Sequence, residues 1–323
     1  ATVAAADPFL SQVAGHLVTA GGKRLRPALT VAVGELAQGL SSSGNSDGGH
    51  PVPGGPASDD VIMGAVAVEL VHLGSLYHDD VMDDARTRRN VESVNSRWGN
   101  LVAILAGDFL LARASEIAAS LGTEVAGLLA TTIGRLCEGQ VAEMATTFDL
   151  GRSEDAYLSS IAGKTAALMA TACRIGAITA HLDRPAIEAL TGYGHSVGMV
   201  FQIVDDILDV VATDEELGKP AGNDLLEGVF TLPVIRALAT DAGGELRELL
   251  ASPITPANVF AARALVQANG AVASAADLAR TYAQEASAGL LADPQLGVGP
   301  VSAALQALGD SIIETIPARV GLH

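Results

Sequence analysis

The sequence predicts an all-α protein, and three observations support this prediction. Hydrophobic residues make up 49% of the 323 residues and aromatic residues only 3%, so the core is built from Ala, Leu, Val and Ile. The apolar positions recur with the 3.6-residue period of amphipathic helices through most of the chain. The Gly/Ser/Pro-rich tract 39–60 interrupts this pattern without a change of composition on either side, which favours a surface loop within a single domain over residues 1–323.

Charge and cysteine usage exclude several classes of protein. The formal net charge of -18 argues against nucleic acids and anionic membrane surfaces as partners. No uncharged apolar run reaches the ~18 residues of a membrane span, and no leader segment is visible, so we expect a cytoplasmic protein without a transmembrane segment. Cys137 and Cys173 lack metal-binding or redox spacing and are expected to be buried, reduced thiols.

The first helical pattern, from Pro8 to about Ala20, leads into the turn Ala20-Gly-Gly-Lys-Arg-Leu-Arg-Pro27. Proline is tolerated in the first turn of a helix, so Lys23 and Arg26 are expected at a helix N-terminus, where backbone N–H groups and the helix dipole attract anions. Pyrophosphate fits such a turn. The alternative is a solvated basic turn.

Two acidic helical segments dominate the sequence, one ending at Asp84 and one running over Phe201-Gln-Ile-Val-Asp-Asp-Ile-Leu-Asp209. At about 100° per residue, Asp79, Asp83 and Asp80 lie at roughly 0°, 40° and 100° around the first helix. The second helix repeats this arc with Asp205, Asp209 and Asp206. Crowded carboxylates need a cation, and Mg²⁺ prefers carboxylates, waters and phosphates. Two solvated helix ends are the alternative, which the repetition disfavours, and an EF-hand fails because no glycine occupies its sixth position.

The few lysines lie in similar contexts. The chain has three, Lys23, Lys164 and Lys219, and each follows a glycine, which suggests contacts with anions. Gly163-Lys164-Thr165 is not a P-loop, because no strand-to-helix turn precedes it. Behind the first acidic helix, Arg86 is expected to neutralise the helix end, and Arg88 and Arg89 to contact phosphate.

The remaining segments are expected to form a helical scaffold. Helical patterns cover about 100–120, 122–148, 154–181 and 185–211, and Asp108 inside the first of these is expected to be buried and hydrogen-bonded. A polar, turn-rich loop follows over 212–228. Helices rich in Ala and Leu then run from Thr231 to about Ala318 without a concentration of reactive side chains.

Taken together, these motifs resemble, in order and spacing over about residues 20 to 235, the trans-isoprenyl diphosphate synthases. The resemblance rests on Gly21-Gly-Lys-Arg-Leu-Arg-Pro27, Asp79-Asp-Val-Met-Asp83 with Arg88-Arg89, Gly163-Lys-Thr165, Phe201 to Asp209 and Gly218-Lys219. It implies a single-domain isoprenoid synthase fold of long helices around a deep pocket, usually as a homodimer. It also implies condensation of isopentenyl diphosphate with an allylic diphosphate.

The resemblance assigns a role to each candidate residue. Three Mg²⁺ ions on the allylic diphosphate belong to Asp79, Asp83 and Asp205, supported by Asp80, Asp206 and Asp209. Ionisation of that substrate is assigned to Asp79, Asp80, Asp83, Lys164 and Asp205, with Arg88, Lys164 and Lys219 as clamps. The isopentenyl diphosphate site corresponds to Lys23, Arg26, His72 and Arg89, and the oxygens that face the allylic cation to Thr165 and Gln202.

One departure and two alternatives accompany the resemblance. Many members carry a lysine at the position of Val229, so one diphosphate contact is absent here. A class I terpene cyclase would replace the second Asp-rich motif, and a subunit of a heteromeric synthase would typically lack both motifs. One turn before Asp79, Ser75 and Gly74 are expected to line the pocket without an aromatic floor, which favours a product of geranylgeranyl length or longer.

Overall fold

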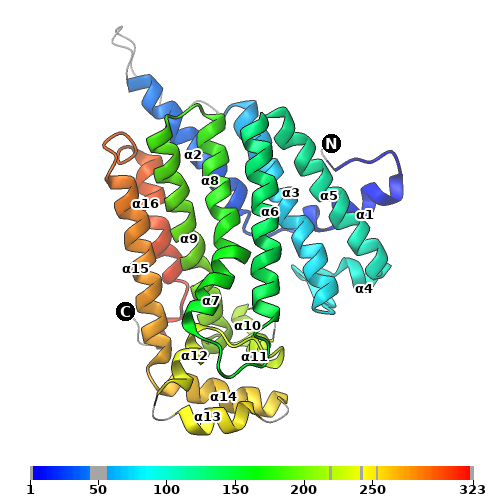
Figure 1. Cartoon of the computed structure of the whole chain (residues 1–323), viewed down its shortest axis with the longest axis vertical. Coiled ribbons are helices and arrows are strands. Elements are labelled where there is room, and N and C mark those ends of the chain that lie inside the picture. The colour runs from blue at the N-terminus through cyan, green and yellow to red at the C-terminus, as the bar shows by residue number, and fades with distance from the viewer. Residues whose placement is uncertain (1–2, 44–56, 218–219, 241–242, 252–253, 321–323) are drawn as a thin grey trace. The chain divides into compact units, whose positions relative to one another are not determined.

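The computed structural model describes residues 3–43, 57–217, 220–240, 243–251 and 254–320. It confirms the all-α prediction, because helices account for nearly all regular structure in these ranges (Figure 1). The chain forms two compact units, residues 1–133 with 171–190 and residues 134–170 with 191–323. Since their boundaries fall inside three helices, the units interleave along the sequence, and the single domain over 1–323 stays a prediction.

The first unit contains the N-terminal helices. They are α1 (Pro8–Thr19), α2 (Leu25–Ser43), α3 (Asp59–Met82), α4 (Val94–Trp98), α5 (Asn100–Ser120) and the beginning of α6 (Thr123–Met144). A hairpin of β1 (Thr87–Arg88) and β2 (Val91–Glu92) comes after α3. Helix α2 therefore extends into the tract expected as a loop from residue 39, of which residues 44–56 lie outside the described part.

Helices α3 and α5 pack side by side (Figure 1). Glycines allow this close approach: a Cβ on Gly74 would lie 3.1 Å from the Gly107 carbonyl oxygen, and a Cβ on Gly107 would lie 2.4 Å from His78 Nε2. Ser58 caps the start of α3 by accepting a hydrogen bond from the Val61 N–H at 3.3 Å. The acidic end of α3 is thus carried by a helix that is capped at its start and packed along its length.

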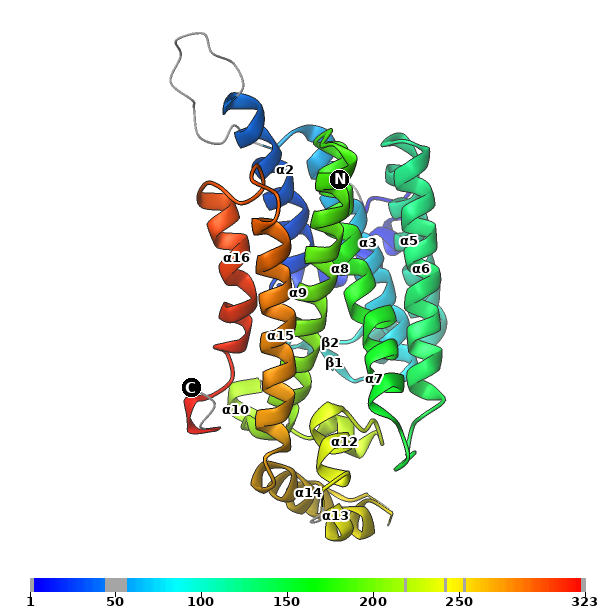
Figure 2. The same ribbon diagram turned by 60° about the vertical axis from the view of Figure 1, so that its left-hand side comes forward.

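The second unit contains the helices with the second Asp-rich motif. They are α7 (Glu154–Ile161), a π-helical turn (Ala162–Ala166), α8 (Ala167–Thr179), α9 (Arg184–Val211), α10 (Asp214–Leu217), α11 (Asn223–Leu226), α12 (Leu232–Leu238), α13 (Gly243–Leu250), α14 (Pro256–Ala268), α15 (Ala271–Leu291), α16 (Pro300–Ile313) and a 3₁₀ turn (Ala318–Val320), with parts of α8 and α9 belonging to the first unit. Helices α15 and α16 run side by side (Figure 2). The four central helices follow their predicted ranges within a few residues.

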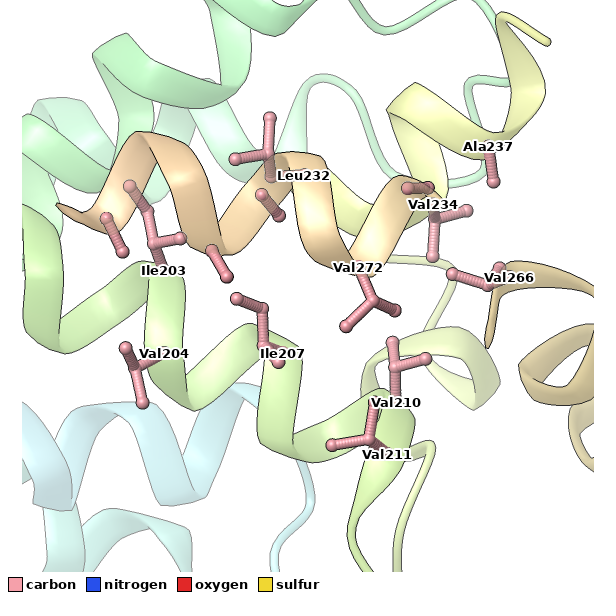
Figure 3. Packing of buried hydrophobic residues seen from close by; sticks show 14 of the residues in the cluster. Ile203, Val204, Ile207, Val210, Val211, Leu232, Val234, Ala237, Val266 and Val272 are labelled. Carbon is pink, nitrogen blue, oxygen red and sulfur yellow. The ribbon is translucent and has the colours of Figure 1, made fainter. Parts of the chain in front are cut away.

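Aliphatic side chains fill the core of the second unit. Ile203, Ile207 and Val210 of α9 face Leu232 of α12 and Val272 of α15 within one cluster (Figure 3). These residues bury the apolar face of α9, so its carboxylates occupy the remaining positions around the helix.

Two stretches of the described chain are apolar and long enough to cross a membrane, Asp59–Met82 and Glu154–Thr179, with mean hydropathies of 1.4 and 1.2. Of their apolar windows, 56% and 67% are buried inside the protein. Such burial is typical of core helices of a folded protein.

Two sequence-based expectations about single residues are wrong. Cys137 is exposed, because it lies on the face of α6 opposite Thr132 and Gly139; Cys173 is buried, and both thiols are free. The Asp108 side chain is 62% exposed and lies 3.3 Å from His78 Nε2, since the buried face of α5 runs through Ala106, Gly107 and Leu110 instead.

Candidate functional site

The aspartates at the acidic end of α3 differ in burial. Asp83 is exposed and Asp79 half-buried, whereas Asp80 is fully buried. Arg88 Nε donates a 2.6 Å hydrogen bond to Asp80 Oδ1, and Asn95 Nδ2 donates to the Asp80 carbonyl oxygen at 2.9 Å. Asp80 Oδ2 is buried without a hydrogen-bond partner. Burial raises the pKa of the Asp80 carboxyl and Arg88 opposes this shift, so the position favours an additional positive charge.

The hairpin behind α3 places the arginines. Arg89 and Asn90 form its two-residue turn with φ of 53° and 62°, as a type I′ turn requires. Arg88 then pairs with Asp80, while Arg89 Nη1 donates to the carbonyl oxygens of Gly21 at 2.8 Å and Leu17 at 3.2 Å. The hairpin therefore serves both the acidic helix and the basic turn.

The basic turn before α2 gathers with α3 into an arginine-rich cluster. Arg26 Nη1 lies 3.3 Å from His72 Nε2, and the buried Arg26 Nε has no hydrogen-bond partner. Glu69 forms ion pairs with Arg24 and, at 3.7 Å, with Arg89. One carboxylate thus faces several guanidinium groups. The predicted position of the basic turn at a helix N-terminus is confirmed, because α2 begins at Leu25.

Burial sets the charge states within this cluster. It lowers the pKa of Arg26 to about 10, with Glu69 opposing the shift, so the guanidinium stays charged at neutral pH. Burial, reinforced by Arg26 and Arg89, lowers the pKa of His72 well below its usual range. His72 is therefore a neutral hydrogen-bonding group. Lys23 lies exposed in the turn that precedes α2.

In the second unit, the aspartates of α9 also differ in burial. Asp205 is exposed, while Asp206 and Asp209 are 3% and 4% exposed. Asp206 accepts hydrogen bonds from Tyr157 Oη at 2.6 Å and Gln202 Nε2 at 2.8 Å. Burial raises the pKa of Asp206 to about 7 against these two hydrogen bonds. Asp209 accepts from the backbone N–H groups of residues 223 and 224, both at 3.3 Å, at the start of α11.

The Gly-Lys-Thr motif lies in the π-helical turn between α7 and α8. Lys164 Nζ donates to Glu143 Oε1 at 2.6 Å, and Thr165 Oγ1 donates to Gln202 Oε1 at 2.7 Å. A Cβ on Gly139 would lie 2.4 Å from the Lys164 backbone nitrogen, so only glycine lets α6 approach this turn. Short π-helical turns are frequent at functional sites. Lys219 lies outside the described residues.

Each unit brings together some of the predicted residues. The first joins Arg26 with His72 and Asp80 with Arg88; the second joins Thr165, Gln202 and Asp206. Sequence reasoning missed the groups that hold them, namely Glu69, Asn95, Glu143, Arg152 and Tyr157. Only Tyr157 left a signal in the sequence, because it precedes Lys164 by two helical turns.

Within the described residues, no three histidine, cysteine or acidic side chains gather into a ready-made metal cluster. The donor chemistry nevertheless fits a hard divalent cation. Asp83 and Asp205 offer exposed carboxylates, and Asp80 offers a buried oxygen without a partner. Mg²⁺ takes one or two carboxylates and completes its shell with water and substrate phosphate, so a preformed cage is not required.

The expected pocket lining below Asp79 needs one correction. Gly74 is buried against α5, where a Cβ would lie 3.1 Å from the Gly107 carbonyl oxygen and from Leu111 Cγ. Ser75 is half-buried, and its hydroxyl donates to the His72 carbonyl oxygen at 2.9 Å. Of this pair, Ser75 is therefore the candidate for contact with a substrate chain.

Comparisons with known proteins agree with the motifs. The family profile described as polyprenyl synthetase matches residues 7–265. The chain is 39% identical over 308 residues to a nonaprenyl diphosphate synthase from Mycobacterium tuberculosis, covering 94% of this chain and 86% of the relative. It is 40% identical over 233 residues to component 2 of the heptaprenyl diphosphate synthase of Geobacillus stearothermophilus, covering 72% of this chain and 68% of that protein. A polyprenyl synthase from Caulobacter crescentus, crystallised with calcium and isoprenyl diphosphate, superposes with a TM-score of 0.85 at 35% identity over 97% of this chain and 90% of the other.

Proposed function

The chain belongs to the polyprenyl synthetase family, and we propose that it condenses isopentenyl diphosphate with an allylic diphosphate to give a geranylgeranyl or longer polyprenyl diphosphate. One observation carries the substrate assignment: the buried Arg26 Nε without a partner, in a cluster where Glu69 faces Arg24, Arg26 and Arg89. Such a cluster binds a diphosphate without a metal ion. The aspartates of the two Asp-rich motifs then bind the diphosphate of the allylic substrate through metal ions.

The reaction needs one bond to break before another forms. The allylic C–O bond breaks and its electron pair leaves with the diphosphate. The double bond of isopentenyl diphosphate then attacks the allylic carbon, and a proton leaves, with the released diphosphate as its acceptor. A cation that neutralises the leaving diphosphate lowers the barrier to the first step.

The carboxylates proposed to hold Mg²⁺ differ in exposure. Asp79, Asp83 and Asp205 are the direct candidates, since each has an exposed or half-exposed side chain. Asp80, Asp206 and Asp209 are buried and support them. When bound, Mg²⁺ supplies electrostatic stabilisation of the departing diphosphate, and the resemblance to the trans-isoprenyl diphosphate synthases implies three such ions.

The basic side chains divide between the two diphosphates. Lys23, Arg26 and Arg89, with neutral His72 as a hydrogen-bonding partner, orient isopentenyl diphosphate. Arg88 serves the allylic diphosphate: its guanidinium has five N–H donors, and Asp80 takes the Nε donor. Lys164 exchanges its contact with Glu143 for a phosphate oxygen, and Lys219 adds a further cation. Thr165 and Gln202 present oxygens to the allylic carbon.

The product is proposed to be long. Ser75 places a small side chain one turn before Asp79, where a bulky residue would stop the growing chain. The Mycobacterium tuberculosis relative is named a nonaprenyl synthase and the Geobacillus stearothermophilus relative a heptaprenyl synthase component. Both names agree with a product of geranylgeranyl length or longer.

The proposed assembly is a homodimer. Helix α5 exposes Leu101 by 71%, Leu105 by 55% and Ile104 by 40%, an apolar face that a second copy would cover. The alternative is a heteromer, because one relative is named as a component. Light scattering on the purified chain distinguishes the two arrangements.

The test of this function is incubation of the purified chain with isopentenyl diphosphate, Mg²⁺ and a series of allylic diphosphates. The series runs from about five to about twenty carbons, and each member is one prenyl unit longer than the one before. We expect incorporation of isopentenyl diphosphate and products of twenty carbons or more. Release of a cyclic hydrocarbon without incorporation would identify a terpene cyclase. Activity that appears only with a second chain would identify a heteromeric synthase.

A further inference from the structure

Four side chains of the second unit form a continuous hydrogen-bonded path that ends at a buried carboxylate. Thr165 Oγ1 donates to Gln202 Oε1 at 2.7 Å, and Gln202 Nε2 donates to Asp206 Oδ1 at 2.8 Å. Tyr157 Oη donates to Asp206 Oδ2 at 2.6 Å. Both carboxylate oxygens of Asp206 are therefore engaged by neutral donors, and the residue is 3% exposed, in contrast to the exposed Asp205 beside it.

The carboxylate fixes the direction of every proton along this path. Asp206 accepts from the amide nitrogen of Gln202, which turns the amide oxygen of Gln202 toward the Thr165 hydroxyl. Thr165 then commits its single hydroxyl proton to Gln202, which leaves the lone pairs of its oxygen available. Hydrogen bonds in such a chain polarise one another, so the ordered path from Asp206 makes the Thr165 oxygen a better partner for a positive centre.

Tyr157 is held in place by an arginine that takes no part in the path. The Arg152 guanidinium lies 5.5 Å from the centre of the Tyr157 ring. Arg152 Nη2 donates to Ser160 Oγ at 2.6 Å, and its Nη1 donates to the Phe230 carbonyl oxygen at 3.0 Å. Tyr157 itself is 1% exposed, so its hydroxyl has Asp206 as a fixed acceptor.

We propose that Tyr157 is a positioning residue and Asp206 an anchor, which together orient Gln202 and Thr165 so that their oxygens stabilise the allylic cation. This inference rests on the proposed prenyl transfer. It gives Asp206 this task in addition to its support of the metal-binding carboxylates, of which the exposed Asp205 is a direct candidate on α9.

The test compares Tyr157→Phe with a matched control, Tyr193→Phe. Tyr193 is also 1% exposed and belongs to the same unit, and its hydroxyl donates to the Leu305 carbonyl oxygen at 2.8 Å, away from the path. Two ligands are titrated by calorimetry in the presence of Mg²⁺. One is an ammonium analogue with a protonated nitrogen in place of the carbon that becomes positive, and the other is an allylic thiodiphosphate, whose allylic carbon carries no charge.

We expect Tyr157→Phe to weaken binding of the ammonium analogue about tenfold, the lower end of the effect of one hydrogen bond to a charged group. Binding of the thiodiphosphate and the Mg²⁺ concentration for half-maximal turnover stay unchanged, and kcat falls while both KM values hold. Tyr193→Phe changes none of these. Equal losses for both ligands, or no loss for either, overturn the inference.

A replacement variant and a wild-type activity assay complete the experiment. If Tyr157→Phe does not fold, Asp206→Asn replaces it, because a side-chain amide at this position lets Gln202 turn its oxygen away from Thr165. This variant is judged by binding of the two ligands and not by the Mg²⁺ requirement, since Asp206 also supports the metal-binding carboxylates. The wild-type chain is assayed for prenyl transfer in parallel. An inactive wild type refutes the proposed function, whereas the overturning results in an active wild type refute only the role of Tyr157.

Discussion

The ion pair between Arg88 and Asp80 leads to a prediction about stability, and the burial of the two side chains sets its magnitude. Asp80 has no exposed side-chain surface and Arg88 retains 31% exposure, so this ion pair lies between the buried and the surface extremes. Breaking a fully buried pair costs about 3–5 kcal/mol, and an exposed pair contributes at most about 1 kcal/mol. We therefore expect Arg88→Met to destabilise the protein by about 2 kcal/mol, because the Asp80 carboxylate is left buried without its donor.

A double-mutant cycle measures this value. Asp80→Asn removes the charge, so Arg88→Met should cost about 0.5 kcal/mol or less in that background. Calorimetric unfolding of the four proteins without Mg²⁺ gives the coupling, and Arg86→Met is the control, since Arg86 is exposed in the same segment. An unchanged melting temperature for Arg88→Met, or an equal loss in both backgrounds, would refute the reasoning.

Three further predictions concern catalysis. Arg26→Ala should raise the KM for isopentenyl diphosphate at least about tenfold and leave that for the allylic substrate within about twofold, with Arg86→Ala as a silent control; equal effects on both substrates contradict the assignment of the basic turn. Asp79→Ala should lower kcat by about 10²–10³ without loss of stability, because it removes charge stabilisation and relieves carboxylate crowding; unaltered turnover in Mg²⁺ ends the metal hypothesis. Ser75→Phe should shorten the product, as sized by chromatography, while isopentenyl diphosphate binding persists; an unchanged product contradicts the open pocket.

The sequence predicted the helices well because periodicity and composition act locally. It predicted α5 and α9 nearly to the residue, since their apolar faces repeat over five or more turns. It did not predict the π-helical turn around Lys164 or the close approach of Gly139 from α6 to this turn. Exposure of Cys137 and Asp108 was missed for a similar reason, because the pattern of one helix does not state which neighbours cover it.

The same limit explains why the aspartates of the two motifs looked equivalent in the sequence. Helical spacing gives their angles around one axis, and in both copies the residue at roughly 100° is buried: Asp80 against Arg88 and Asn95, and Asp206 against Tyr157. These partners come from segments 8 to 49 residues away along the chain. Burial of this second aspartate is thus a shared feature of the two motifs, even though the donors that satisfy it are chemically different.

The third aspartate breaks this correspondence, because the two motifs lead into different segments of the chain. Helix α3 ends at Met82, so Asp83 stands at the helix end with its side chain exposed. Helix α9 continues to Val211, and the N-terminus of α11 then covers Asp209 and donates two backbone hydrogen bonds to its carboxylate. Asp209 therefore ties the segment beyond α9 back to the helix. A substitution there should disturb the start of α11 more than it disturbs the carboxylate face, in contrast to Asp83.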